Sequence, residues 1–217
     1  GHGAAVLVPP VASARGKRPV VVALHGNFDR PSWACDAWRQ LVAGRAFLVC
    51  TRGLPRRDAP GMNRFSYPSS VWARREVRAA LGALAKRYPQ RADTSRVALI
   101  GFSLGATFAA KIARREPRRF SRVMLVEGGH TGWKATARRY FKGGGEALVL
   151  GCGGWRCAQR ARRACKLVAR AARRKKRCVA IYARGVGHSY TEPLPARVKP
   201  SFDALLLEPL LRHGAAP

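Results

Sequence analysis

One serine in the chain has the neighbours that a nucleophile needs. Ser103 lies in Gly-Phe-Ser-Leu-Gly at residues 101–105, directly after the buried apolar run 97–100 and before a helical pattern. This spacing predicts a strained strand-to-helix turn, in which residues two positions from the serine must have almost no side chain. The hydroxyl then projects above the sheet near a helix N-terminus, which favours negative charge. We expect Ser103 to be a catalytic nucleophile; a glycine-rich turn with a capping serine is the structural alternative.

A serine hydroxyl needs a neighbouring general base, and five histidines could supply it. His188 lies six residues after the last predicted strand, in a loop that should return across the sheet edge beside Ser103. It is the first choice, and His130 is the reserve. His25 follows the first predicted strand, where bonding to nearby backbone is the expected role. The other two histidines lie near the ends of the chain.

These motifs together resemble the α/β-hydrolase superfamily, particularly its small esterase and thioesterase-like members. The resemblance covers roughly residues 18–212 and rests on three motifs: Leu24-His25-Gly26, the turn at 101–105, and Gly187-His188. It implies a serine nucleophile, a histidine base and an acid between them in sequence. It also implies that no metal and no organic cofactor takes part.

The acid is the departure from that pattern. The family usually places a carboxylate after the fifth predicted strand, but residues 151–157 read Gly-Cys-Gly-Gly-Trp-Arg-Cys. Glu127, directly after the fourth strand, is the best-placed alternative in the usual order, and some family members carry the acid there. Glu127 could instead pair with one of the many arginines. A Ser–His dyad assisted by backbone or water also remains open.

Two hydrogen-bond donors must stabilise the negative carbonyl oxygen of the reaction intermediate. The first should be the amide of Leu104, the residue after the nucleophile. The second should come from the loop after His25-Gly26, with Asn27 as first choice and Phe28 as second.

Aromatic residues gather in the loops expected at this edge, as in an apolar small-molecule cleft. Trp33, Trp133 and Tyr190 are the candidates for the substrate pocket, although packing is the favoured role of Trp33 and of Trp133 taken singly.

Apolar runs alternate with helical patterns along the chain. The predicted strands cover 20–24, 46–50, 97–100, 123–126, 147–150 and 178–182. Continuous apolarity predicts strands buried on both faces, so we expect an open, doubly wound, mostly parallel sheet of about six strands with helices on both faces. Residues 1–217 should form a single domain with its core at about 18–212. We expect loops at 51–70 and 128–145, and a last helix at 201–208 disrupted by Pro209.

Six cysteines in 217 residues favour disulfides and an exported protein. Cys35 and Cys50 lie in neighbouring elements and are the favoured pair. Two further bridges should form among Cys152, Cys157, Cys165 and Cys178, with a buried free thiol at Cys165 as the alternative. Their spacings lack paired C-x-x-C units, so zinc is disfavoured. The first residues show no signal-peptide pattern and read as a mature chain. We expect a secreted or periplasmic protein, or otherwise a cytoplasmic one.

The chain has 42 Lys and Arg against 11 Asp and Glu, a formal net charge of +31. Solvated arginines account for most of this charge in one interpretation, and a polyanion-binding surface in the other. Residues 156–177 contain eleven basic residues and no acidic one. Non-specific association with anionic surfaces is expected at low salt. No nucleic-acid-reading module is present. No apolar run is long enough to span a bilayer.

The sequence favours a monomeric serine ester hydrolase that acts on a small or polymeric ester through an acyl-enzyme. Two alternatives remain. The first is a hydrolase-like fold used as a basic binding module for an anionic partner, with weakened catalysis, because the usual acid is missing and the net charge is +31. The second is a serine peptidase or amidase that uses the same site.

Overall fold

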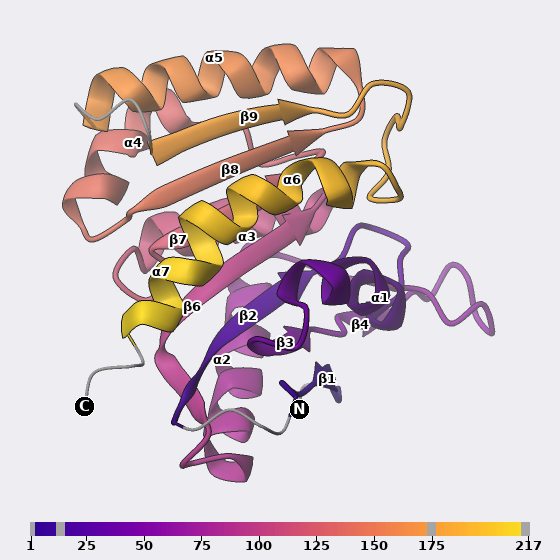
Figure 1. Ribbon diagram of the computed structural model, residues 1–217. Helices are drawn as coiled ribbons and strands as arrows, with labels where there is room; N and C mark the ends of the chain where they lie inside the picture. The colour runs from indigo at the N-terminus through magenta and orange to yellow at the C-terminus, as the bar shows by residue number, and fades with distance from the viewer. Residues whose placement is uncertain (1–2, 12–15, 173–176, 214–217) are drawn as a thin grey trace.

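The computed structural model describes residues 3–11, 16–172 and 177–213. Its centre is a seven-stranded sheet with the order β1-β3-β2-β6-β7-β8-β9, shown in Figure 1. The strands are β1 (Val6–Val8), β2 (Arg18–Leu24), β3 (Phe47–Cys50), β6 (Ala92–Phe102), β7 (Arg122–Val126), β8 (Ala147–Cys152) and β9 (Cys178–Tyr182). All pairs are parallel except β1 with β3. This confirms the predicted α/β class and all six predicted strands. The sequence prediction missed β1, a three-residue edge strand too short to leave a pattern.

Helices cover both faces of the sheet. They are α1 (Pro31–Val42), α2 (Ser70–Arg87), α3 (Leu104–Arg115), α4 (Trp133–Lys142), α5 (Trp155–Ala172), α6 (Leu194–Phe202) and α7 (Glu208–His213). Val20 and Val22 of β2 pack in the core that contains α2 to α5, whereas Val21 and Ala23 pack in the core with α1, α6 and α7. The alternation follows from the two-residue period of a strand. In Figure 1 α6 and α7 run in front of the sheet.

The helical run at the C-terminal end differs from the prediction. It begins at Leu194 rather than 201, and it continues past Pro209 to His213. A π-helical segment at Asp203–Leu207 precedes Pro209, and Leu205 at position i−4 has a carbonyl that accepts a hydrogen bond from Arg122. Proline normally removes the bond to that carbonyl and clashes with it. The wider turn and the arginine explain why the helix is not broken there.

The predicted loop at 128–145 also contains a helix. α4 buries Trp133, Ala137 and Tyr140, which recur at spacings of four and three residues. That spacing is the signature of one helix face. The flanking glycines and the high charge of this segment obscured it in the sequence. The other predicted loop, 51–70, contains the short strands β4 (Leu54–Pro55) and β5 (Phe65–Ser66), which pair with each other.

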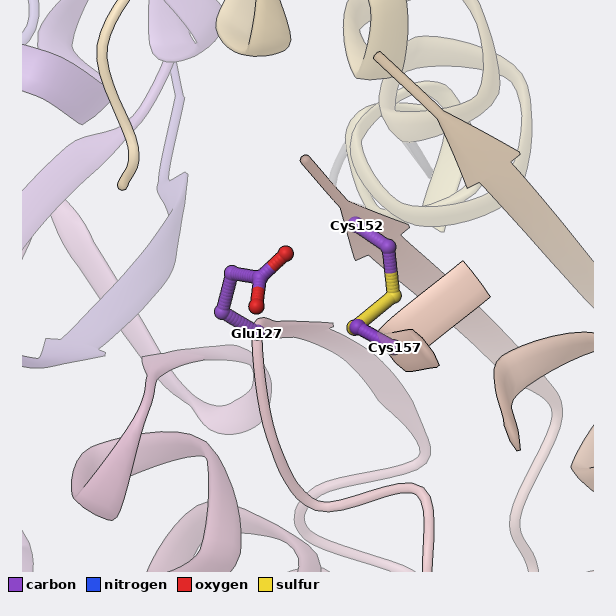
Figure 2. Close-up of side chains that lie close together, drawn as sticks. All are labelled: Glu127, Cys152 and Cys157. Carbon is purple, nitrogen blue, oxygen red and sulfur yellow. A yellow bond between two sulfur atoms is a disulfide. The ribbon is translucent and has the colours of Figure 1, made fainter. Parts of the chain in front are cut away.

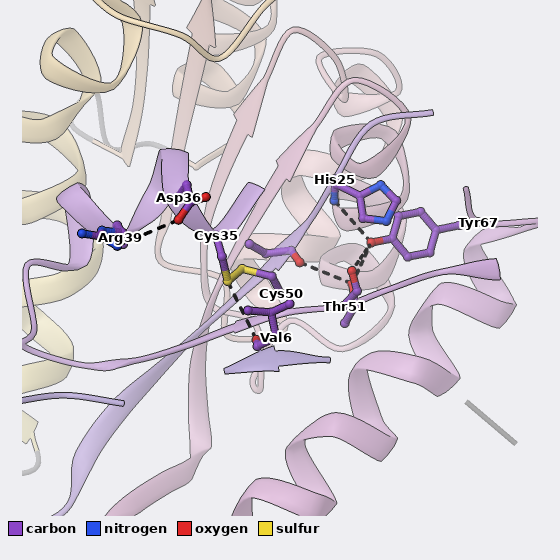
Figure 3. Close-up of a disulfide and its surroundings, with 9 residues drawn as sticks. Val6, His25, Cys35, Asp36, Arg39, Cys50, Thr51 and Tyr67 are labelled. Atoms are coloured by element: carbon purple, nitrogen blue, oxygen red, sulfur yellow. Dashed lines mark hydrogen bonds and ion pairs between the residues drawn. A yellow bond between two sulfur atoms is a disulfide. The ribbon is translucent and has the colours of Figure 1, made fainter. Parts of the chain in front are cut away.

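All six cysteines are paired. Cys35–Cys50 joins α1 to β3, as Figure 3 shows, and this confirms the favoured pair. Cys152–Cys157 closes the turn between β8 and α5, and Cys165–Cys178 joins α5 to β9. Two further bridges therefore form among the last four cysteines, and the free thiol considered for Cys165 is excluded.

Helix α5 carries the first part of the basic segment. Its apolar stripe of Ala158, Ala161 and Val168 is buried, and its arginines face outward. Residues 173–176 lie outside the described residues. Within the described ranges, no helix is long and apolar enough to cross a membrane.

Candidate active site

The turn between β6 and α3 holds Ser103 in a strained conformation. Its φ of 52° lies in the left-handed region, which a residue with a side chain rarely adopts. A Cβ on Gly101 would lie 2.5 Å from the Ala106 Cα, and one on Gly105 would lie 2.3 Å from the His25 carbonyl oxygen. Both glycines are therefore required by close backbone packing. The Ser103 amide donates to the Val126 carbonyl at 2.9 Å, which fixes the turn against the end of β7.

Three side chains from separate elements form one hydrogen-bonded chain. His188 Nε2 lies 2.9 Å from Ser103 Oγ, and His188 Nδ1 lies 3.2 Å from Glu127 Oε2. The His188 side chain is 61% exposed, but that of Glu127 is only 5% exposed. The imidazole is thus open to an incoming molecule, while the carboxylate behind it is shielded from water. The structure brings together the three residues that the sequence singled out.

Backbone amides hold the Glu127 carboxylate. Oε1 accepts from the amides of Gly153 at 2.5 Å and Gly154 at 2.9 Å, which leaves Oε2 facing His188. Glu127 itself has a φ of 53°, so its backbone is strained like that of Ser103. Strained residues of this kind concentrate at functional sites. The turn in which the sequence lacked an acid therefore supplies the donors that hold the acid from the neighbouring strand.

Figure 2 shows the Cys152–Cys157 disulfide beside Glu127. One ligand-type atom from each of these three residues lies within 4.8 Å of the others. The two sulfurs are bonded to each other, and metal binding by cysteine requires the thiolate. Glu127 Oε1 is also already occupied by two amide donors. This cluster is better described as a disulfide-closed turn that hydrogen-bonds to Glu127 than as a metal centre.

The loop that carries His188 is tied to the same turn. The Gly187 amide donates to the Gly153 carbonyl at 3.3 Å, so Gly153 contacts both the Glu127 carboxylate and the residue before His188. The His188 ring also packs on Phe102, with 5.3 Å between ring centroids. Within the described ranges, His188 and not His130, the reserve base, forms the hydrogen bond to Ser103. Burial, and secondly Arg160, lower the pKa of His130 below its ordinary value.

Asp29 organises the loop after β2, and the sequence analysis did not identify it. Its buried carboxylate accepts from the amides of Gly26 at 3.1 Å and Arg30 at 2.7 Å, and from the Tyr190 hydroxyl at 2.8 Å. Burial, with the nearby negative charge of Asp29, raises the pKa of Tyr190 above its ordinary value. One side chain thus connects the His-Gly loop with the loop that carries His188. A carboxylate shortly after a glycine turn was the available sequence signal.

The candidate oxyanion residues lie where β2 and β6 end side by side. In the described part of the chain, the amides of Leu104, Asn27 and Phe28 donate to no protein acceptor. Phe28 has a left-handed φ of 58°. The Asn27 side-chain oxygen accepts from Arg56 and Ser66, both at 2.7 Å, which anchors this loop to the segment around β5. The expectation for His25 also holds, since its ring nitrogens lie 2.7 Å from the carbonyls of Gly26 and Arg52. Figure 3 shows the adjoining bonds of the Tyr67 hydroxyl, which accepts from the His25 amide and pairs with the Thr51 hydroxyl.

The three pocket candidates have different positions. Tyr190 packs edge-on against Phe102, beside the candidate triad, with 4.4 Å between centroids. Trp33 is 42% exposed, and the Arg64 guanidinium lies 4.2 Å above its ring. Trp133 is only 1% exposed and donates to the Gly129 carbonyl, so it packs in the core under α4. The placement of Trp133 in a substrate pocket is therefore corrected.

Comparison with known protein families decides the relationship that the geometry suggests. The model of the Esterase family matches residues 2–134, which is more than half of the chain. The chain belongs to the Esterase family. The matched segment of this esterase includes Ser103 and Glu127 and ends before His188. No curated protein matches the chain.

Similar solved structures show which fold this esterase has. A carboxylesterase from Bacillus cereus is 18% identical with a TM-score of 0.61, over 93% of this chain and 94% of that chain. An S-formylglutathione hydrolase from Agrobacterium tumefaciens is 17% identical with a TM-score of 0.59, over 96% of this chain and 89% of that chain. The esterase therefore has the α/β-hydrolase fold, and it is an esterase-type hydrolase by family.

Proposed function

We propose that this esterase hydrolyses carboxylic esters through Ser103, with His188 as the base and Glu127 as the acid. The observation that carries the proposal is the unbroken chain from Ser103 Oγ through the His188 ring to Glu127 Oε2. In such an arrangement the serine is activated by the imidazole, and the carboxylate selects its tautomer and stabilises the imidazolium.

The reaction would proceed in two halves. Ser103 Oγ attacks the ester carbonyl carbon while His188 Nε2 takes its proton, and the amides of Leu104 and Asn27 or Phe28 donate to the carbonyl oxygen as it becomes negative. His188 then gives the proton to the departing alcohol, which leaves an acyl group on Ser103. A water molecule, deprotonated by His188, attacks that acyl group; the bond to Ser103 Oγ breaks, His188 returns the proton to Oγ, and the carboxylic acid is released.

The alternative of a binding module with weakened catalysis rested on two features, the missing acid after the fifth predicted strand and the net charge of +31. Glu127 would supply the missing carboxylate from the neighbouring strand, and two backbone amides orient this buried group. This arrangement favours the enzyme over the binding module. The three disulfides support the proposal of an exported protein, because such bonds persist in oxidising compartments.

Hydrolysis of a short-chain nitrophenyl ester tests the proposal. Wild-type protein should release nitrophenol, and Ser103→Ala should lose about 10⁶-fold in kcat, the typical effect of removing a triad serine. Ser95→Ala is the matched control, because Ser95 is exposed and, among the described residues, its hydroxyl bonds to Asp93 nearby. Equal activity in the two variants would contradict the proposal. Preferential cleavage of a peptide amide would instead favour the peptidase alternative.

A further inference from the structure

A pocket of about 580 Å³ lies beside the candidate triad, between the end of β7 and the start of α5. His188 and Glu127 form one wall of it, and Trp155, Arg156 and Arg160 line it from α5. The pocket is therefore continuous with the proposed reaction centre, although its three residues from α5 take no part in the mechanism above.

The pocket carries two arginines that no ion pair neutralises within the described part of the chain. Arg156 and Arg160 are four residues apart, so they lie on the same face of α5. Among the described residues, neither guanidinium has a hydrogen-bond acceptor or a carboxylate partner. Glu127 is the one carboxylate in the lining, and its two oxygens already face amides and the His188 ring. The positive end of the α5 dipole adds to the same potential.

The chemistry of the proposed reaction indicates which part of a substrate reaches this pocket. His188 Nε2 must deliver its proton to the departing alcohol oxygen, so the alcohol portion has to lie against the imidazole. The same imidazole is a wall of the pocket. Trp155 is 54% exposed and offers an aromatic ring beside the two arginines. An alcohol portion with an apolar body and a negative end would contact both.

We propose that this pocket binds an anionic group, a carboxylate or a phosphate, on the alcohol portion of the ester substrate. The inference rests on the serine-esterase mechanism proposed above. Arg156 and Arg160 would bind the anion through charge-assisted hydrogen bonds, and they are specificity-determining residues rather than catalytic ones.

Three matched esters test the inference. They are the acetate esters of p-hydroxybenzoate, of p-hydroxyphenyl phosphate and of the neutral p-hydroxybenzamide. Wild-type kcat/KM should be higher for at least one anionic ester than for the neutral ester of p-hydroxybenzamide. In the double variant Arg156→Ala/Arg160→Ala, the ratio of anionic to neutral kcat/KM should fall roughly tenfold, the scale of losing two such contacts.

The control separates a local pocket from the general attraction of a basic protein. Arg163→Ala/Arg170→Ala removes the same charge from exposed positions of α5 that do not line the pocket. This control should keep the wild-type ratio. An equal fall of the ratio in both double variants, or no preference for either anion in the wild type, would overturn the inference. Failure to hydrolyse any of the three esters would instead count against the proposed function.

Discussion

Glu127 Oε2 lies 3.2 Å from His188 Nδ1, although the two residues are 61 positions apart in the chain. Glu127 reaches the imidazole from the end of β7, whereas the family's usual position after β8 holds only the glycine turn. Glu127 thus follows β7, whereas the two amides that hold its carboxylate follow β8. The role of the carboxylate and the role of the turn can therefore be tested by separate substitutions.

Replacement of the acid tests the first of these roles. Glu127→Gln keeps the size of the side chain but favours the wrong imidazole tautomer, so kcat should fall roughly 10³–10⁴-fold with little change in KM. Steady-state kinetics on a nitrophenyl ester measures this. Glu146→Gln is a suitable control, because Glu146 begins the segment at the opposite edge of the sheet and pairs with Arg122. Near-normal turnover in Glu127→Gln would show that this carboxylate has only a structural role.

Replacement of a disulfide tests the supporting turn. Cys152→Ala/Cys157→Ala should lower kcat roughly ten- to hundredfold, because a small displacement of Gly153 and Gly154 misplaces Glu127. Cys35→Ala/Cys50→Ala is the control, since that bridge lies between α1 and β3.

The variant that loses more stability should be the one that keeps more activity. The Cys35–Cys50 bridge spans 15 residues and the Cys152–Cys157 bridge spans five. Loop-closure entropy predicts losses of about 3 and about 2 kcal/mol, respectively. Chemical denaturation should rank the control as the less stable variant, while kinetics should rank it as the more active one. The same ranking in both assays would contradict the role of the turn.

Tyr190 should act as a positioning residue through Asp29. Tyr190→Phe removes the hydroxyl that donates to Asp29, so kcat should fall roughly three- to tenfold, a fraction of the energy of a hydrogen bond to a charged group. KM should change little if the hydroxyl does not contact the substrate. Tyr140→Phe is the control, because its hydroxyl donates to the carbonyls of Phe120 and Ser121 in the core. A lower kcat in the control, or a change confined to KM, would contradict this role.

Glu76 should make stability depend on pH. Its carboxylate is buried and accepts from the amides of Arg52 and Gly53, and burial raises its pKa above the ordinary 4.5. The folded state therefore holds the proton more tightly than the unfolded state. The resulting contribution to stability is present below pH 4.5 and is lost as pH rises through the folded-state pKa.

Glu76→Gln removes this titration. Urea unfolding from about pH 4 to 7 should show that the free energy of unfolding of the wild type falls relative to that of the variant as pH rises. A difference between the two proteins that does not vary with pH would contradict the prediction.

The sequence predicted the site best where backbone packing restricts the residue type. Ser103 was identifiable because Gly101 and Gly105 leave no room for a Cβ. His188 followed from its place after the last strand, and Glu127 from the few carboxylates that could reach it. The amides of Gly153 and Gly154 were not predictable, because a backbone donor leaves no trace in residue identity.

The errors have physical causes as well. The sequence makes Trp133 a candidate for the substrate pocket because its predicted loop follows the fourth strand, but Trp133 lies on the buried face of α4. The periodicity shared with Ala137 and Tyr140 was the signal for that helix. The sequence predicts that Pro209 disrupts a helix, but the π-helical turn before it and the bond from Arg122 to the Leu205 carbonyl allow the helix to continue. A hydrogen bond between residues so far apart in the chain cannot be inferred from the residues around Pro209.

Peptide mapping after reaction with a fluorophosphonate tests the central claim most directly. The reagent phosphonylates a serine only where a base activates it, so a single adduct should form on Ser103. Labelling should be lost in His188→Ala, which lacks the imidazole 2.9 Å from the hydroxyl. An adduct on another serine, or no adduct in protein that hydrolyses esters, would contradict the account.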